Sequence, residues 1–455
     1  MHKRTLSFSH NNIFLFSVFC FAAEICLFWP GLLKDDSAVQ LQQAVMGSFT
    51  DHHPPLMAFY WSVLNKMYPG PGLMLVTHLL LFWGAIYYFC RSLKDSVSQV
   101  ACGLLAIISP LLIFHPFILK DIGFANCYLF VMSVLTYLTV TQQKMSPRMA
   151  FMLTVILFYG TAVKFQAMFI LPLLTLWMGL TLALTYKRGL LVGLGLFASL
   201  YASISFFNAH VSTPSNSWQW VKLYDLAGIS IRKNQNYFPS FVTDYPGFST
   251  ERLHQFYNPR RVDDYVYRPD PVLIKGATPQ QAKEVWHYWF ETVLRHPVAY
   301  LHHRGAVCWE QICLSSIKSP QEIKGKEIMS PSLLRVSTLL DHYNLIPFAK
   351  LFTSFAPYLP FQILYLCLGL YYRRSPLGRT LLFLNGIGLG LLATLFFFSM
   401  AAEARYLYLS LGCVHFSHPF AYALWRSRKT ARRPGLMDTF APLVKVSATQ
   451  YIERA

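Results

Sequence analysis

Residues 34–55 read KDDSAVQLQQAVMGSFTDHHPP and follow directly on the first long apolar segment. Asp36, Gln40 and Gln43 stand at i, i+4 and i+7, so a helix places all three on one face. Ser37 can help to cap the start of this helix. A glycine and a proline pair later in the stretch end it, because proline lacks a backbone donor and restricts its neighbour. The stretch predicts an acidic, amide-lined helix at a membrane surface.

Composition places the chain among membrane proteins. Its 455 residues are 54% hydrophobic, and only 13% are charged, about half the share of a typical soluble domain. Mean hydropathy is +0.36. The formal net charge is +18, but many basic residues fall in short loops between apolar segments, where they act as a topology signal. We therefore expect an all-α polytopic membrane protein that contacts the lipid bilayer and no nucleic acid.

The apolar segments predict about ten transmembrane helices. They are 12–33, 71–90, 97–119, 122–140, 149–163, 167–186, 189–207, 355–372, 380–400 and 404–425. Residues 56–68 are too short to span and predict an interfacial or re-entrant helix. The first segment lacks a cleavage signal, so we expect an uncleaved span. Basic residues at alternate turns place both termini in the cytoplasm.

This pattern divides the chain into four parts. Residues 1–207 form an N-terminal transmembrane module that includes the first outer loop, 34–70. Residues 208–350 form an outer-face, mostly helical loop domain with a helical stretch near 279–315. Residues 351–425 supply the C-terminal transmembrane helices, and 426–455 form a basic, partly disordered cytoplasmic tail.

The outer turns carry charges directly beside apolar spans, where charge is costly unless it is paired, solvated or functional. These charged residues are Asp35, Asp36, Lys120, Asp121, Lys164, Glu403 and Arg405. Because the spans pack as a bundle, we expect the turns to converge on one cavity at the outer leaflet.

Each acidic or basic group also has a simpler interpretation. Asp35 and Asp36 are either a solvated helix start or a general base or metal ligand. Lys120 and Asp121 either neutralise each other or separate, with Asp121 joining Asp36. Lys164 either extends its ammonium to the interface or binds an anion.

The remaining polar groups suit a hydroxyl-rich or phosphate-bearing ligand. His53 either contacts phosphate or acceptor or, with His52, binds a metal ion. Arg405 lies between Glu403 and Tyr406, and arginine grips phosphate oxygens with two donors. The two cysteines of the large loop, at 308 and 313, leave a disulfide open.

Several motifs are absent from the sequence: a Walker loop, a strand-borne GxGxxG, HExxH and GxSxG. ATP-driven transport and soluble nucleotide chemistry are therefore unsupported.

The first outer loop resembles that of GT-C fold glycosyltransferases, such as protein O-mannosyltransferases, lipid A aminoarabinose transferases and their bacterial relatives. The resemblance rests on Asp36-Ser37, Gln40, Gln43, Gly47 and Asp51-x-His53-Pro54, and extends to Lys120-Asp121, Lys164-x-Gln166 and Glu403-x-Arg405-Tyr406. The large loop is similar only in its position and in Trp286 and the run from His296 to Arg304.

The resemblance implies a GT-C-like fold, a bacterial inner (cytoplasmic) membrane location and a polyprenyl-phosphate-sugar donor. It implies Asp36 as the base, with Asp35 as the alternative, and Asp121 as a second acid. Phosphate contacts fall to Arg405, Lys164 and Lys120, with the other residues of the matching motifs lining the substrate site. The acceptor is a glycolipid, polysaccharide or protein, and a divalent metal ion is possible. Lys164 departs from the arginine that relatives often carry.

Two other classes of protein stay open. An O-antigen ligase or polymerase would rely on Arg260, Arg261 and Arg304 in the large loop. A transporter or flippase of lipid-linked sugar would place its polar groups near the bilayer midplane, whereas here they lie at outer turns.

Overall fold

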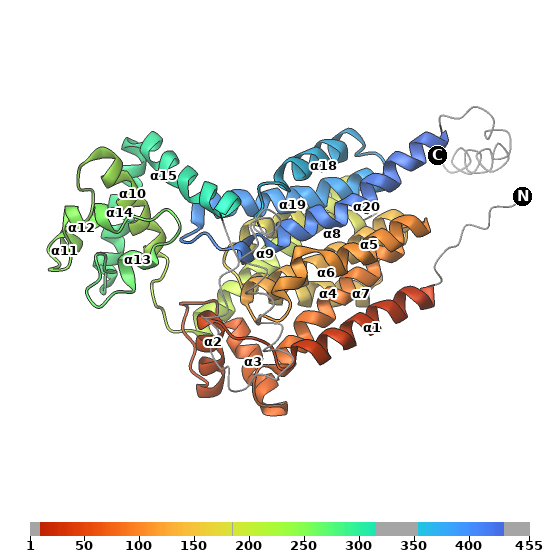
Figure 1. Ribbon diagram of the computed structural model, residues 1–455, viewed down its shortest axis with the longest axis horizontal. Coiled ribbons are helices and arrows are strands. Elements are labelled where there is room, and N and C mark those ends of the chain that lie inside the picture. The colour runs from red at the N-terminus through yellow and green to blue at the C-terminus, as the bar shows by residue number, and fades with distance from the viewer. Residues whose placement is uncertain (1–9, 184, 315–353, 432–455) are drawn as a thin grey trace, which may run out of the picture.

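The computed structural model describes residues 10–183, 185–314 and 354–431. Within these ranges the chain is helical, with isolated β-bridges and no strand of a sheet. Long apolar helices form a bundle, and a domain of shorter helices projects beyond one end of it (Figure 1). We call this the outer-face domain; it comprises residues 212–314.

Six of the described helices are long and apolar enough to cross a membrane. They are α1 (His10–Phe28), α4 (Gly72–Ser92), α5 with the 3-10 helix η1 (Ser96–Phe114), α6 (Lys120–Thr141), α9 (Tyr186–Val211) and α19 (Pro376–Phe398). Shorter apolar helices are α7 (Pro147–Ala162), α8 (Ala167–Leu182) and α18 (Leu359–Tyr371). The last described helix is α20 (Tyr408–Ala431). The chain is thus an all-helical membrane protein, and the count of ten spans stays a prediction.

Helix α6 forms the centre of the bundle. Its apolar window is 89% buried, whereas that of α9 is 17% buried. The difference follows from position, because α6 contacts α4, α7, α8, α19 and α20, while α9 packs mainly on α8. A helix that is apolar on every side is stable only in such surroundings or in lipid. The first residues of α6, Lys120 and Asp121, are therefore held at a fixed place by the whole bundle.

Small residues let α8 and α9 approach closely. A Cβ added at Gly179 would stand 2.3 Å from the carbonyl oxygen of Gly189, and one at Gly193 would stand 2.9 Å from Leu176 Cα. Glycine is favoured at such membrane crossings because backbones can pack directly. This close approach lies at the C-terminal end of α8, the end away from the turn that carries Lys164.

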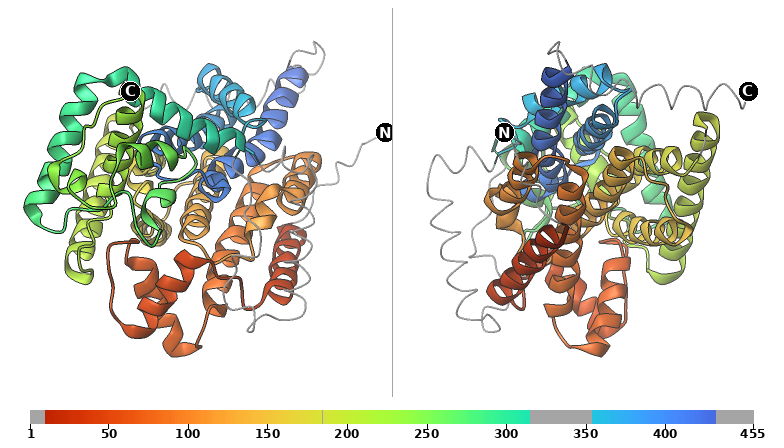
Figure 2. Two further views of the ribbon diagram at one scale, coloured as in Figure 1. Left: turned by 60° about the vertical axis from the view of Figure 1, so that its left-hand side comes forward. Right: turned by 90° about the vertical axis from the view of Figure 1, so that its right-hand side faces the viewer.

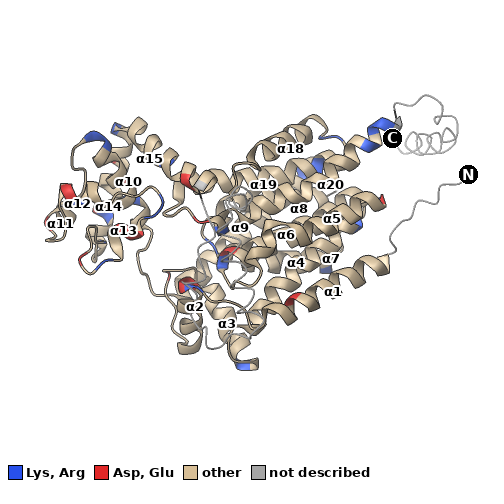
Figure 3. Cartoon of the chain, viewed as in Figure 1, with Lys and Arg blue, Asp and Glu red and all other residues tan. Residues whose placement is uncertain are grey.

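The remaining described helices lie at one end of the bundle. They are α2 (Asp35–Met46), α3 (Leu56–Met67), η5 (Ala404–Leu407) and, in the outer-face domain, α10 (Gln219–Lys233), α11 (Ser240–Thr243), α12 (Thr250–Gln255), α13 (Asp263–Val266), α14 (Pro279–Arg295), α15 (Pro297–Trp309) and the π-helix η2 (Glu310–Leu314). Figure 2 shows α2 and α3 extending together from one side of the bundle. Figure 3 shows charged residues mainly at helix ends and in the outer-face domain, with long uncharged stretches between.

Several local predictions are confirmed. A helix begins at Asp35 and ends before Gly47, whose φ of 66° is easily reached only by glycine. Residues 56–67 form the predicted short helix. The helical stretch near 279–315 is present but broken at His296, which precedes a proline.

The predicted C-terminal tail differs from the structure in its first residues. Helix α20 continues to Ala431 because its basic last turn finds partners: Arg426 Nη1 donates to Asp95 Oδ1 at 3.0 Å, and Arg428 lies 3.9 Å from the ring centre of Tyr372. Cations also suit a helix C-terminus. The predictions for residues 432–455, and for the part of the outer loop from 315 to 350, lie outside the described residues. Both loop cysteines, 308 and 313, are free thiols.

Candidate functional site

Five segments that are distant in sequence meet where α2 approaches the end of the bundle. They contribute Asp36, His53, Lys120 with Asp121, Lys164, and Arg405 with Tyr406. We call this group the charged cluster. Figure 3 shows charged residues of both signs gathered at this place. The charged residues of the predicted outer turns therefore meet in the structure, and their place at a cavity of the outer leaflet stays a prediction.

The start of α2 directs Asp36, rather than Asp35, into the cluster. Ser37 Oγ accepts from the backbone N–H of Lys34 at 2.8 Å and donates to the Lys34 carbonyl at 3.0 Å. This exchange fixes the first turn. Asp35 is exposed, whereas the Asp36 side chain is only 26% exposed.

Two cations hold the same oxygen of Asp36. Arg405 Nη2 donates to Asp36 Oδ2 at 3.0 Å, and Lys120 Nζ donates to it at 3.4 Å. Burial raises the pKa of Asp36, but Lys120 and Arg405 outweigh burial and bring that pKa well below its ordinary value. Asp36 is therefore ionised at neutral pH.

Arg405 connects Asp36 to the second acid. Its Nε lies 3.5 Å from Asp121 Oδ2, an ion-pair contact rather than a hydrogen bond. Lys164 Nζ donates to the other oxygen of Asp121. Asp121 and Lys164 are almost fully buried, so each depends on the other for compensation of its charge. Lysine thus stands here as a buried counter-ion.

His53 is neutral and has a defined tautomer. Burial and the nearby Lys120 ammonium lower the pKa of His53 to about 3. Lys120 Nζ lies 2.6 Å from His53 Nδ1 and can only donate, so Nδ1 accepts and Nε2 carries the proton. Nε2 stands 3.9 Å from Asp36 Oδ1. The imidazole therefore turns an N–H donor toward the free side of the Asp36 carboxylate.

Tyr406 provides the aromatic wall of the cluster. Lys164 Nζ lies 4.4 Å from the centre of the Tyr406 ring, and Arg405 Cζ lies 5.4 Å from it. Both distances are within the range of cation–π attraction.

The other predicted substrate residues fall into two groups. Gln40 is buried, and neither atom of its amide has a partner among the described residues, so this amide is available to a ligand or water. Gln43 instead donates to Thr50, and the backbone of Glu403 is held by Gln311. Gln166 is half-buried and begins α8 without capping it through its side chain.

The outer-face domain is attached to two segments that carry the cluster. On one side, His52 Nδ1 lies 2.9 Å from Ser217 Oγ. On the other, Arg260 O accepts from the Ala402 amide at 2.7 Å, and Arg304 Nη1 donates to Ser399 O at 2.7 Å. The domain therefore fixes both His53 and Arg405 through their sequence neighbours.

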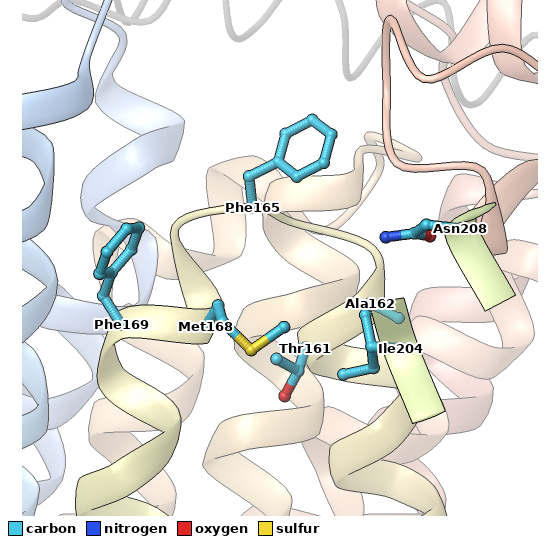
Figure 4. Close-up of a pocket in the computed structure, with 7 residues that line it drawn as sticks. All are labelled: Thr161, Ala162, Phe165, Met168, Phe169, Ile204 and Asn208. Carbon is cyan, nitrogen blue, oxygen red and sulfur yellow. The ribbon is translucent and has the colours of Figure 1, made fainter. Parts of the chain in front are cut away.

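A small apolar pocket adjoins the cluster at the turn that holds Lys164. It has a volume of about 250 Å³. It is lined by Thr161, Ala162, Phe165, Met168, Phe169, Ile204 and Asn208, whose side chains surround it in Figure 4. Phe165 and Phe169 are more than half exposed, so the pocket is open at the surface of the bundle.

Sequence reasoning missed a polar chain inside the bundle. Glu24 of α1 lies 2.9 Å from His115 Nδ1, and His115 Nε2 lies 3.1 Å from the hydroxyl of Tyr408. All three are buried. An acid within the first apolar segment was the available signal, because such residues inside a span need a partner. These three side chains connect α1 and the end of η1 to the start of α20, directly after η5.

The cluster does not suit a divalent cation in this arrangement. Among the described residues no three His, Cys, Asp or Glu side chains gather as metal ligands. Both cluster carboxylates are already contacted by cations, which would repel a metal ion.

No family model, curated protein or solved structure matches this chain.

Proposed function

We propose that the protein is a glycosyltransferase that moves a sugar from a polyprenyl-phosphate-linked donor to an acceptor hydroxyl at the outer face of a bacterial cytoplasmic membrane. The observation that carries this proposal is the position of Arg405, which contacts the two carboxylates Asp36 and Asp121 at once. A base and a set of phosphate-binding cations thus lie within one site at the end of an apolar bundle.

The charge of the cluster suits a phosphate ligand. Three cations, Lys120, Lys164 and Arg405, are in direct contact with two carboxylates, Asp36 and Asp121, so these five groups carry one net positive charge. Glu403 adds a further Coulomb attraction on Arg405. A lipid phosphate is a good leaving group once its developing negative charge is stabilised, and fixed cations supply that stabilisation.

Asp36 is the proposed base that accepts the proton of the acceptor hydroxyl. In the free protein its pKa is low because Lys120 and Arg405 hold the ionised form more strongly than burial opposes it. A donor phosphate that draws these two cations to itself weakens their hold on Asp36 and raises its basicity. Donor binding would thereby prepare the base.

The apolar pocket suits the lipid part of the donor. It is lined mainly by apolar side chains, and its lining residue Phe165 directly follows Lys164 in the chain. A phosphate bound at the cluster would leave its isoprenoid chain beside this pocket, in contact with aromatic and aliphatic side chains.

The arginines on which an O-antigen ligase or polymerase would rely make structural contacts here. Arg304 is fully buried, with Nε 2.6 Å and Nη2 2.9 Å from the two oxygens of Asp225. Arg260 contacts Glu310 at 3.4 Å, and Arg261 contacts Asp264 at 3.0 Å. These contacts favour the charged cluster over the outer-face arginines as the reacting centre.

The test begins with cells that contain or lack the protein. Mass spectrometry of their envelope glycolipids, polysaccharides and glycoproteins identifies the product as one missing sugar-sized increment. The wild-type gene should restore the increment, and Asp36→Asn should not, although the variant reaches the membrane in equal amount. Asp35→Asn is the matched control, because this neighbouring acid is exposed, and it should restore the increment. Full restoration by Asp36→Asn, or no missing increment at all, would overturn the proposal.

A further inference from the structure

Three tryptophans of the outer-face domain gather around one lysine. Lys222 Nζ lies 3.9 Å from the ring centres of both Trp286 and Trp289, and 5.6 Å from that of Trp218. The rings of Trp286 and Trp289 are 5.4 Å apart, and those of Trp218 and Trp286 are 6.5 Å apart. We call these three rings and Lys222 the tryptophan platform.

One ring of the platform is held by a buried carboxylate, and the other two rings are exposed. Trp289 Nε1 donates to Asp225 Oδ2 at 2.8 Å, and the same buried carboxylate holds Arg304. Trp218 and Trp286, in contrast, are 42% and 51% exposed. Lys222 lies over one face of Trp286 and one face of Trp289.

The surroundings of the platform include exposed charged groups. Helix α14 carries Lys283, Glu284, His287, Glu291 and Arg295, and most of these side chains are exposed. Figure 1 shows α10 and α14 beyond the ends of the bundle helices. Flat aromatic faces with polar groups beside them suit a ligand that is apolar on one face and hydroxylated at its edge.

A pyranose ring has this character. Its C–H groups carry a small positive charge and pack on the negative face of an aromatic ring, while its hydroxyl groups bond to polar neighbours. Lys222 and Lys283 offer donors there. We propose that the tryptophan platform binds a pyranose residue of the acceptor, so that the acceptor is a glycan. This inference rests on the proposed function and names its acceptor class.

The platform is joined to the charged cluster by a short run of contacts. Trp218 follows Ser217, whose hydroxyl lies 2.9 Å from His52 Nδ1. The rings of His52 and His53 are 4.6 Å apart, and His53 approaches Asp36. Only a few neighbouring residues therefore separate Trp218 of the platform from Asp36 of the cluster.

Binding can be measured without transfer. The full chain carrying Asp36→Asn, purified in detergent, is applied to a microarray of hexose, hexosamine and hexuronic acid oligosaccharides, and affinity for the best ligand is then measured in nanodiscs. We expect binding to at least one class, a loss of affinity of tenfold or more for Trp286→Ala and Trp218→Ala, and a smaller loss for Trp286→Phe. Trp309→Ala is the matched control, because Trp309 is 65% exposed in the same domain, and it should bind normally.

The outcomes separate this inference from the proposed function. No binding to any oligosaccharide, or an equal loss for Trp309→Ala and Trp286→Ala, overturns the platform even if Asp36→Asn abolishes transfer. Binding that depends on Trp286, in a protein whose Asp36→Asn variant still transfers sugar, upholds the platform and overturns the role of Asp36. Thermal unfolding of each variant identifies a misfolded protein. If Trp286→Ala is misfolded, the affinity of Trp286→Phe, which keeps an aromatic ring, is the test of the platform.

Discussion

The buried pair of Asp121 and Lys164 offers a quantitative test. Asp121→Asn removes the carboxylate that faces a lysine whose side chain is only 2% exposed. Breaking a buried pair by removing one partner costs about 3–5 kcal/mol, because the other charge is left uncompensated. The cost has a ceiling, since Lys164 can lose its proton instead. Neutralising a lysine of ordinary pKa at pH 7 costs about 4.6 kcal/mol.

This ceiling predicts an unusual pH dependence. In Asp121→Asn the folded-state pKa of Lys164 lies below its unfolded value, because burial disfavours the charged form. Between these two values the unfolded chain binds one more proton than the folded chain, so stability rises with pH by about 1.4 kcal/mol per unit. The deficit relative to wild type should therefore shrink as pH rises from 7 toward 10.

The measurement is the free energy of unfolding in mixed micelles over that pH range. Lys164→Met is combined with Asp121→Asn as a double-mutant cycle, in which the double variant should recover most of the stability lost by Asp121→Asn. Sugar transfer should stay low in both the Asp121→Asn variant and the double variant. A deficit below about 1 kcal/mol at pH 7, or one that does not change with pH, would show that Lys164 is not a buried charge held by Asp121.

Three further predictions address the rest of the site. Arg405→Lys should lower sugar transfer roughly a hundredfold with unchanged protein levels, because a lysine cannot contact both carboxylates; near-normal transfer would contradict its bridging role. Glu24→Leu should destabilise the protein by about 1–3 kcal/mol by leaving His115 Nδ1 without its partner, and Glu24→Gln, which can still bond to Nδ1, should cost less. Gly47→Ala should cost about 1 kcal/mol because its φ of 66° is strained for alanine, whereas Gly195→Ala, which meets nothing within 4 Å, should not destabilise α9.

The sequence predicted which residues gather at this site better than it predicted which ion pairs they form. The short helix predicted from Asp36 onward and ended by Gly47 followed from periodicity and a glycine stop, both of which are local. The gathering of Asp36, Asp121 and Arg405 followed from charges beside apolar spans, since a bundle brings alternate turns to the same end.

Pairing depends on packing that no local pattern contains. Lys120 and Asp121 are adjacent in sequence, yet Asp121 pairs with Lys164 while Lys120 reaches Asp36. The first turn of a helix directs successive residues to different sides, so the self-neutralising alternative does not describe this pair. The link from Glu24 to Tyr408 spans almost the whole chain and could be found only in three dimensions.

The way in which the outer-face domain is attached limits how such a protein could be re-engineered. An exchange of residues 212–314 for the corresponding part of another enzyme would separate Arg304 from Ser399 and Ser217 from His52. A chimera aimed at a new acceptor would therefore have to carry residues 399–403 and 50–53 from the same parent. Under the proposed function, acceptor specificity and reactivity would be inherited together in this architecture.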